Sequence, residues 1–385
     1  MKQLSKIMLA GVASVCLATP ALAWDFSAAG SSSAKWMTST TNTGATGAKD
    51  ISSANYSSSS GGVTVSSSNT DGANTAKFSY TADWNGDDGN FDEYVTVSGS
   101  KKVGDWTASS STSQYMNKDA TAGASPMTAG GTAAITLTDG SITYKLGDAS
   151  HLSTAEKAVN GPMDGAQDAE ARVDSFNGFS VGLGVGPGTL TVALDHNSGA
   201  ASTALGDQSI AIGCGGQGTG FGLNFSGNVG ADISFTYGSG SSVPSETYCV
   251  GDNKTNAASA NTMGLGVSVP MGNIGIGFDY ESSATSSTVA TADTLMAASG
   301  FELSVTMGGI ADGTVGLNVS SHTTTNTPAA TKVATDTVAS GTEIWWTVPI
   351  GATSLSVGYG ASSSAVGTGD PTTATQMGAE MTLSF

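Results

Sequence analysis

The feature that most constrains this chain is an alternation of apolar with small or polar side chains that recurs along its length. At the end of the chain, Met377, Ala379, Met381, Leu383 and Phe385 share one parity, while Gly, Glu, Thr and Ser occupy the other. Because successive side chains of a strand point to opposite faces, a period of two predicts a β-strand with one apolar face. The alternation therefore predicts an all-β chain.

The alternating runs come mostly in pairs joined by tight turns, such as the turn at Asp139-Gly140. Paired runs around a short Gly, Asp, Asn or Pro turn are the signature of a β-hairpin. A direct count gives 18 strands when 24–36 and 61–69 are taken as the first two. These two stretches are Ser-rich and weakly apolar, so the count falls to 16 if neither is a strand.

Longer stretches rich in Ser, Thr, Ala and Asn separate the hairpins. They fall at residues 198–217, 240–260, 283–298, 322–340 and 363–373. Short turns alternating with long loops are typical of a transmembrane antiparallel β-barrel with short periplasmic turns and long extracellular loops. Most of the six tryptophans fall near expected strand ends or in a late strand, which predicts a place in the aromatic girdles of such a barrel.

The first 23 residues have the layout of a secretory signal peptide. Lys2 and Lys6 precede an apolar stretch, and 21–23 read Ala-Leu-Ala, a small-residue cleavage site. The mature chain is then expected to be residues 24–385. No stretch after residue 23 approaches the roughly 20 apolar residues of a membrane helix, so a mature chain in a membrane must cross it as a closed barrel.

The net charge and the cysteines limit the ligands and the covalent cross-links that the mature chain is expected to have. Without residues 1–23 the chain keeps 11 basic against 31 acidic residues, a net charge of −20. Such a balance argues against nucleic acid and anionic ligands and favours cations. Cys214 and Cys249 survive cleavage; an exported protein would allow a disulfide between them, but two unpaired thiols fit their spacing equally well.

The leader followed at once by a strand, the repeated hairpins with long loops on one side, and the last strand ending Met-Thr-Leu-Ser-Phe resemble the Gram-negative outer-membrane porins of the general diffusion family. The resemblance is architectural and covers the mature chain. It implies a cell outer-membrane location and a homotrimer. It implies as well that Phe385 belongs to an assembly signal read by the barrel-insertion machinery.

The expected function is a non-enzymatic, water-filled pore for passive diffusion of small hydrophilic solutes and ions. Acids dominate the charged residues on the polar parity of the strands, and rings of carboxylates favour cations. A cation preference follows, unless screening in a wide aqueous pore removes it. The expected pore-lining residues are Lys77, Asp83, Lys145, Asp195, Asp232, Asp279, Glu281, Glu302 and Glu380.

The segment 148–170 is less Ser-rich than the other loops and follows an early hairpin. Its position is similar to that of the inward-folding constriction loop of general porins. The resemblance implies a constriction formed by Asp164, Asp168, Glu170 and Arg172. The alternative is a surface loop in which Arg172, the chain's only arginine, pairs locally with Glu170 or Asp174.

The loop 83–93, Asp-Trp-Asn-Gly-Asp-Asp-Gly-Asn-Phe-Asp-Glu, concentrates carboxylates. Its pattern departs from that of an EF-hand, so it predicts either a weak Ca²⁺ site or a solvated hairpin tip. No other cofactor is expected. His151, His196 and His322 are scattered and have no partners at metal-ligand spacing.

Two rival functions remain open. A secreted adhesin or surface-layer protein would also be acidic and rich in Ser, Thr and Gly, but would not need an apolar face on every hairpin. An outer-membrane barrel enzyme would need a catalytic constellation. Residues 178–182 match G-x-S-x-G and 213–218 match G-x-G-x-x-G, yet the first lies inside an alternating strand and the second lacks a following helix.

Overall fold

The structure is a computed structural model of the chain. It describes residues 24–43, 50–85, 90–117, 133–149, 151–153, 155–163, 176–197, 203–205, 208–210, 216–244, 257–289, 292–327 and 333–385. Every regular element in these residues is a β-strand, which confirms the all-β prediction. None of them forms a helix of the length and apolarity needed to cross a membrane. The predicted signal peptide, 1–23, lies outside the described residues.

The strands are β1 (Asp25–Thr43), β2 (Asp50–Asp71), β3 (Asn74–Asn85), β4 (Asn90–Val103), β5 (Trp106–Asn117), β6 (Ala133–Thr138), β7 (Ile142–Ala149), β8 (Phe176–Val185), β9 (Gly188–Asn197), β10 (Thr203–Leu205), β11 (Gln208–Ile210), β12 (Gly216–Asn228), β13 (Asp232–Pro244), β14 (Ala257–Met271), β15 (Ile274–Val289), β16 (Ala292–Ile310), β17 (Gly313–Thr327), β18 (Thr335–Ile350), β19 (Thr353–Val366) and β20 (Thr372–Ser384).

Eighteen of these strands form one antiparallel sheet, and β10 and β11 form a small separate hairpin. Consecutive strands pair along the chain, and β9 pairs with β12 across the small hairpin. The first strand pairs with both β2 and the last strand, β20. The sheet therefore closes on itself as an antiparallel β-barrel without a free edge. The count of 18 is confirmed, because both Ser-rich N-terminal stretches are strands.

Alternate connections are very short turns whose backbone fits a tight hairpin. Gly72 and Gly272 occupy two of them with φ of 57° and 65°, a conformation that glycine adopts without steric cost. The β16–β17 turn has positive φ at both central residues without glycine, since Ala311 and Asp312 have φ of 48° and 60°. Turns of this kind match the twist of the flanking strands and fix their register.

Of the stretches predicted as long loops, 283–298, 322–340 and 363–373 are mostly strand in their described residues. Pairing of β15 with β16 continues to Val289 and Ala292, which leaves 290–291 as the connection. Likewise β17 extends to Thr327, and β19 extends to Val366. The prediction was wrong for these stretches because it required apolar alternation, whereas backbone pairing only requires residues that tolerate extended geometry, and threonine favours it.

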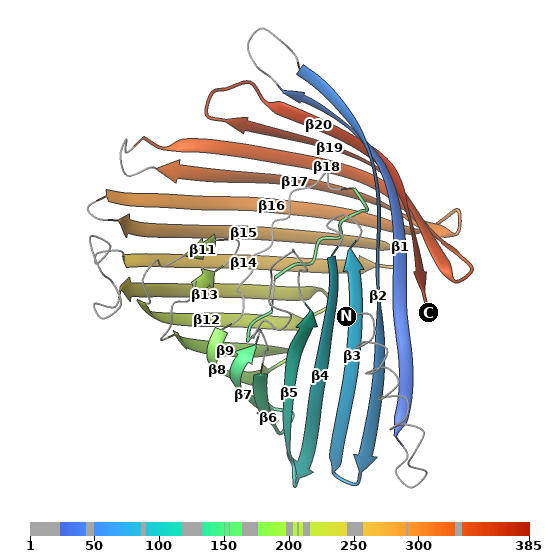
Figure 1. The fold of residues 1–385 in the computed structure, drawn as a ribbon. Helices are drawn as coiled ribbons and strands as arrows, with labels where there is room; N and C mark the ends of the chain where they lie inside the picture. The colour runs from blue at the N-terminus through green and yellow to red at the C-terminus, as the bar shows by residue number, and fades with distance from the viewer. Residues whose placement is uncertain are drawn as a thin grey trace. The chain divides into compact units, whose positions relative to one another are not determined.

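The chain divides into two compact units. The larger unit comprises Ala34–Ser58 and Gly140–Leu383, and the smaller unit comprises Met1–Ser33, Ser59–Asp139 and Ser384–Phe385. In the larger unit, β12 to β19 lie side by side as a continuous run of long strands (Figure 1).

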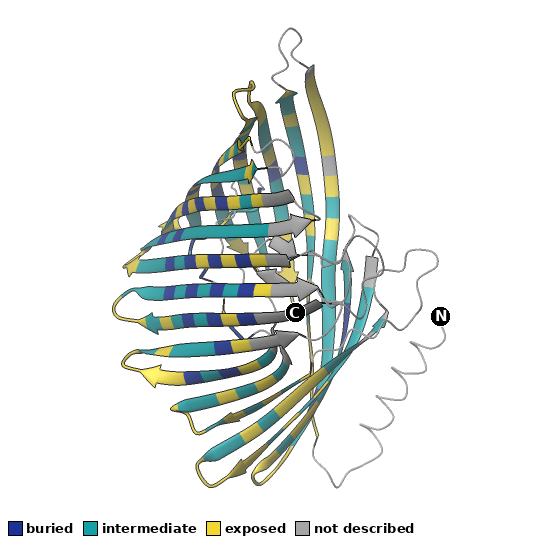
Figure 2. Ribbon diagram, turned by 90° about the vertical axis from the view of Figure 1, so that its left-hand side faces the viewer, coloured by how far each residue is buried: buried dark blue, intermediate teal, exposed yellow. Residues whose placement is uncertain are grey.

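Burial in the larger unit is inverted relative to a soluble protein. On one face, hereafter the apolar face, large side chains are exposed, for example Phe301 at 42%, Leu317 at 41% and Met377 at 54%. On the opposite, polar face, Glu302 and Glu343 are buried. Figure 2 shows the resulting banding along the strands. Exposed apolar positions recur on β16, β17, β18, β19 and β20, as a lipid-facing barrel surface requires.

In the smaller unit, neighbouring strands are joined by hydrogen bonds between side-chain hydroxyl groups. Ser27 pairs with Ser66 at 2.8 Å, and Thr96 pairs with Ser113 at 2.8 Å. At the end of the chain, Gly30 N donates to the Phe385 carbonyl at 2.8 Å, and Phe385 N donates back to the Gly30 carbonyl at 3.0 Å. The terminal phenylalanine thus extends the closing strand pair by one residue, with its side chain 64% exposed.

Candidate functional site

A segment without regular structure, residues 151–163, crosses the polar face of the larger unit; we call it the strap. It lies within the predicted constriction segment 148–170, and the structure describes all of it except residue 154. In Figure 1 it appears as a thin green trace across the strands. Its contacts proceed in sequence order from β8 to β20, so the strap runs across the strands rather than along them.

The strap begins with a buried histidine. His151 Nδ1 lies 2.8 Å from Ser180 Oγ on β8, and its Nε2 lies 2.9 Å from the Gly147 carbonyl. A carbonyl can only accept, so Nε2 carries the proton and Nδ1 accepts from the Ser180 hydroxyl. Both side chains are buried. The pair resembles a nucleophile and its base, but the bond joins the first residue of the strap to β8 and so holds the strap there.

Ser153 makes the next attachment, to β12 and β13. Its hydroxyl donates to Asn224 Oδ1 at 2.9 Å. Its carbonyl accepts from Asn224 Nδ2 at 3.1 Å and from Thr236 Oγ1 at 2.7 Å. Two neighbouring strands therefore bind one main-chain carbonyl, which fixes the direction of the strap at this point.

Asp279 on β15 binds the strap through two consecutive main-chain N–H groups. Lys157 N donates to both carboxylate oxygens, at 2.7 and 2.9 Å, and Ala158 N donates to Oδ2 at 2.5 Å. Asp279 is 1% exposed. Hydrogen bonds to an ionised acceptor are roughly twice as strong as neutral ones, so this carboxylate compensates for its burial by binding the strap's backbone.

The next turn of the strap is bound by β16 and β17. Val159 N donates to Ser304 Oγ at 2.8 Å, and the Val159 carbonyl accepts from Asn318 Nδ2 at 3.1 Å. The same amide nitrogen lies 2.6 Å from Asn160 Oδ1 and contacts Glu302 Oε1, so its two hydrogens are shared among three acceptors. Both main-chain groups of one strap residue are thus satisfied by the sheet, and Glu302 supports the amide that does so.

Glu343 on β18 repeats the arrangement of Asp279. Gly161 N donates to its Oε2 at 3.0 Å, and Met163 N donates to its Oε1 at 2.6 Å. The Glu343 side chain has no exposed surface. Two carboxylates on different strands therefore bind four main-chain N–H groups of the strap.

Glycines on the sheet let the strap approach the strands closely. A Cβ atom at Gly266 would collide with the Ala155 carbonyl, and one at Gly277 would collide with the Lys157 carbonyl. Any other residue at either position would displace the strap. Close approach of two backbones is one of the physical reasons for glycine within a strand.

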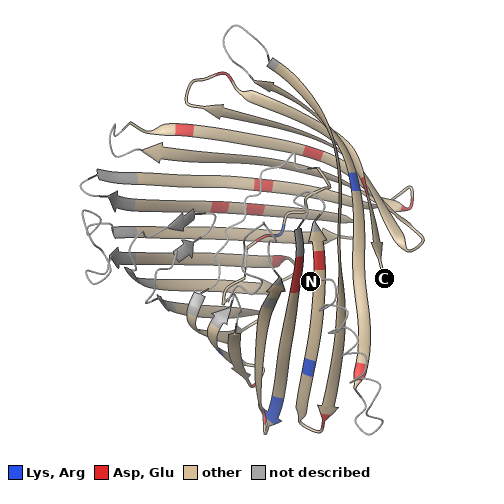
Figure 3. Ribbon diagram, in the orientation of Figure 1, with Lys and Arg blue, Asp and Glu red and all other residues tan. Residues whose placement is uncertain are grey.

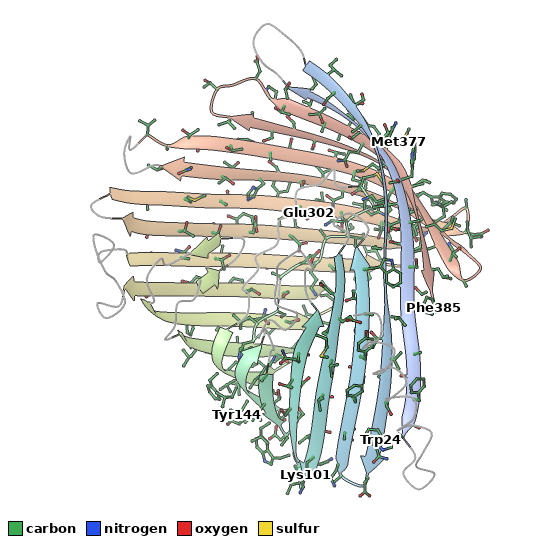
Figure 4. The ribbon with its side chains drawn as sticks, in the orientation of Figure 1. Trp24, Lys101, Tyr144, Glu302, Met377 and Phe385 are labelled. Carbon is green, nitrogen blue, oxygen red and sulfur yellow. The ribbon has the colours of Figure 1, made fainter. Side chains whose placement is uncertain are left out.

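The arrangement decides what these acids can do chemically. Figure 3 marks the acidic positions of the larger unit in red, and Figure 4 labels Glu302 on β16. Because Asp279, Glu302 and Glu343 are at most 2% exposed, they are covered by protein. Asp279 and Glu343 bind the strap, Glu302 binds Asn318, and none of the three presents an exposed carboxylate.

The predicted pore-lining residues all lie at positions of the polar parity, but their surroundings differ. Asp279 is buried beneath the strap, and Glu302 is buried against Asn318. Glu281 contacts His322, with Oε1 and Nε2 3.1 Å apart, and Asp232 accepts from Asn228 at 2.6 Å beside a short turn. Partly exposed or exposed polar-face positions are Lys145 and Glu380 in the larger unit, and Lys77 and Asp83 in the smaller. For Asp195 the structure gives only the backbone, in β9.

Several predicted site residues lie outside the described residues. These are the constriction residues Asp164, Asp168, Glu170 and Arg172, and the disulfide candidates Cys214 and Cys249.

Sequence reasoning missed the strap's own acid and its main anchor. Glu156, on the strap, is exposed. Glu343, on β18, lies on the polar face of its strand, and this position in the alternation could have identified it as a polar-face acid. Trp345 is only 6% exposed, and a Cβ at Gly161 of the strap would lie 2.7 Å from its ring. A girdle position is therefore wrong for this tryptophan, because it faces the strap.

The predicted calcium loop is only partly described, since 86–89 lie outside the described residues. Asp83 on β3 pairs in register with Asp92 on β4, and Tyr80 Oη donates to Glu93. Within the described ranges, no three His, Cys, Asp or Glu side chains gather as a metal site. The Ca²⁺ site stays a prediction.

No protein-family model matches the chain, and no curated protein matches it in sequence. Solved structures do match. The outer membrane channel DcaP of Acinetobacter baumannii has a TM-score of 0.56 at 9% identity, covering 94% of this chain and 97% of that one. The trimer form of OmpT, an outer membrane protein of Vibrio cholerae, has 0.51 at 9%, covering 94% and 100%. At such identities the shared property is the fold, which is that of outer-membrane porins and channels.

Proposed function

We propose that this chain, folded like outer-membrane porins and channels, resides in the bacterial outer membrane and forms a water-filled pore. Small hydrophilic solutes and ions diffuse through it passively, without catalysis. The polar face lines the pore, and the apolar face contacts lipid. A closed sheet satisfies every backbone hydrogen bond, which is the condition for crossing hydrocarbon.

The observation that carries the proposal is the inverted burial of the larger unit. Met377 and Phe301 are 54% and 42% exposed on one face, while Asp279 and Glu343 are 1% and 0% exposed on the other. In water, such an apolar surface repeated over many strands would drive aggregation. In lipid it lowers the free energy of the folded barrel. An adhesin that functions in water has no use for this arrangement.

The strap is the constriction of the proposed pore. It lies on the polar face, and its exposed described residues are Ser153, Glu156, Val159 and Asn160. Since the sheet's most buried acids bind the strap, the local field that a solute meets comes mainly from the exposed Glu156 and from partly exposed groups such as Glu380. Their negative charge supports a preference for cations.

The first test is single-channel recording of the detergent-purified full chain in a planar bilayer, with the reversal potential measured under a KCl gradient. Stepwise conductance with a cation-selective reversal potential is the expected result. Conductance without selectivity would support the pore but contradict the proposed preference for cations. A folded sample that gives no conductance would contradict the pore and favour the adhesin.

Deleting Phe385 tests the assembly part of the proposal. The deletion removes the terminal pair with Gly30 and the aromatic end of the last strand. We expect less folded barrel in outer-membrane fractions, whereas a secreted adhesin would be exported at normal yield. Phe385→Tyr keeps an aromatic terminus and should restore insertion.

The homotrimer is part of the same proposal, supported by the fold shared with a protein that has a trimer form. Unheated, detergent-solubilised protein should migrate or sediment as three chains. For the loop 83–93 we propose only weak Ca²⁺ binding, measured by calcium titration against the variant Asp92→Asn.

A further inference from the structure

The end of the strap lies over the strands that close the sheet. Pro162 and Met163 are its last described residues, and Met163 is 2% exposed. A Cβ atom at Gly358 on β19 would lie 3.1 Å from Met163 Cγ, and one at Gly378 on β20 would lie 3.2 Å from Met163 Cε. The methionine side chain therefore packs directly on both strands.

Gly378 also marks the place where the last strand meets the first. A Cβ atom there would collide with the Trp36 carbonyl and lie 3.0 Å from Met37 Cα, both on β1. Met37 is itself buried at 9% exposure. We call the pairing of β20 with β1 at these residues the seam. Met163 packs on one side of it.

The seam differs physically from the other strand pairs. Neighbouring strands are mostly joined by a connection that keeps them close, and many of these are turns of two or three residues. The seam joins the two ends of the sheet, so closing it requires the ordering of the whole intervening chain, and that entropic cost grows with loop length. An additional contact that bridges distant strands to the seam would reduce its tendency to open.

The strap provides such a bridge because its other attachments lie on strands that do not belong to the seam. Asp279 on β15 and Glu343 on β18 bind its main chain, and Met163 N is itself one of the groups that Glu343 binds. The position of the Met163 side chain is thus fixed by a buried carboxylate two strands away from β20.

We propose that the strap is a clasp that holds the seam closed. Through Asp279 and Glu343 it is bound to β15 and β18, and through Met163 it covers β20 where β20 meets β1. This role is independent of conduction, because it would stabilise the sheet whether or not the barrel passes ions. It predicts that local opening of the sheet starts at the seam when Met163 no longer packs there.

The test is hydrogen–deuterium exchange of the full chain in detergent, comparing wild type with Met163→Ala. Seam peptides covering 34–40 and 374–380 are compared with a reference peptide covering 274–280 in β15. We expect exchange at the seam to accelerate about tenfold, because a buried side chain is lost, while the reference peptide changes little. Val159→Ala is the matched control: Val159 is also on the strap but 46% exposed, and it should leave both regions unchanged.

Equal acceleration in all three peptides, or no acceleration at the seam, would overturn the clasp. If Met163→Ala does not fold, Met163→Leu preserves apolar volume with a different shape and should give a smaller acceleration confined to the same two peptides. None of these readouts uses conductance, so a failed clasp and a failed pore are distinguishable.

Discussion

The two units of the molecule use similar small polar residues on the polar face for different purposes. In the larger unit, polar-face side chains such as Asn318 and Thr236 have no exposed surface and bind the strap or its supports. In the smaller unit, described polar-face residues such as Thr96 and Ser27 pair hydroxyl to hydroxyl and keep part of their surface exposed. What covers a strand therefore decides whether its polar side chains bind another segment or pair with one another across the sheet.

The difference teaches how a chain with few large residues builds a core. In the described part of the larger unit the buried apolar residues are mostly alanines, with Leu152, Met163, Trp345 and Met37 as the large ones. Leu152 and Met163 belong to the strap, and Met37 and Trp345 belong to the sheet. The core is thus formed where the strap meets the sheet, and its tightest contacts are main-chain hydrogen bonds and glycine contacts rather than interdigitated side chains.

The substitution with the largest expected effect on the difference between the two units is Glu343→Gln. The amide presents a donor where one carboxylate oxygen accepted an N–H group, so the strap should loosen at Gly161 and Met163, with a loss of about 1–3 kcal/mol in unfolding free energy. Single-channel conductance should rise because the constriction moves. Thr96→Ala in the smaller unit is the control and should cost about 1 kcal/mol, with unchanged conductance. Equal effects of the two changes in urea unfolding would contradict the proposed difference between the units.

A second change tests the close approach of the strap. Gly266→Ala places a Cβ against the Ala155 carbonyl and should cost about 1–3 kcal/mol through overpacking. At Gly99, in the smaller unit, the nearest atom to a Cβ is the Thr75 carbonyl oxygen at 3.4 Å. Gly99→Ala should therefore lie within about 0.5 kcal/mol of wild type. Urea midpoints of both variants measure the contrast, and tolerance of Gly266→Ala would mean that the strap is not docked as described.

A smaller effect is expected at the start of the strap. Ser180→Ala removes the hydrogen bond to His151 and should cost about 1 kcal/mol. If the pair is structural, wild-type protein should not react with a fluorophosphonate probe. Covalent labelling at Ser180 that is lost in Ser180→Ala would instead indicate an outer-membrane enzyme.

The smallest structural effect, yet a distinct functional one, is expected from Glu156→Gln. The substitution removes one negative charge from an exposed position of the strap, so it should shift the reversal potential towards zero without changing the free energy of unfolding. Lys77→Gln, an exposed polar-face position of the smaller unit, should shift it in the opposite direction. A reversal potential that neither variant changes would indicate that screening dominates, as expected for a wide pore at a Debye length of about 8 Å.

The fold was predictable because period-two alternation and turn residues are local signals. The parity of Ile142, Tyr144 and Leu146 indicated the apolar face, on which Tyr144 stacks with Phe179 at a centroid distance of 6.2 Å. Long loops were overpredicted at 283–298, where no apolar pattern marks the paired strands. The segment 148–170 was singled out by composition, but which of its residues contact the sheet depends on pairings with β8 to β20 that no local pattern encodes.

The sequence by itself determined the strands, their number and the face that each turns to lipid, since these depend on neighbours along the chain. Only the tertiary structure decided the role of each acid. Asp279 and Glu281 stand two residues apart on the same parity of β15, yet one is 1% exposed beneath the strap and the other contacts His322. The physical reason is that a carboxylate's function depends on what covers it, and here the cover is a segment more than a hundred residues away in the chain.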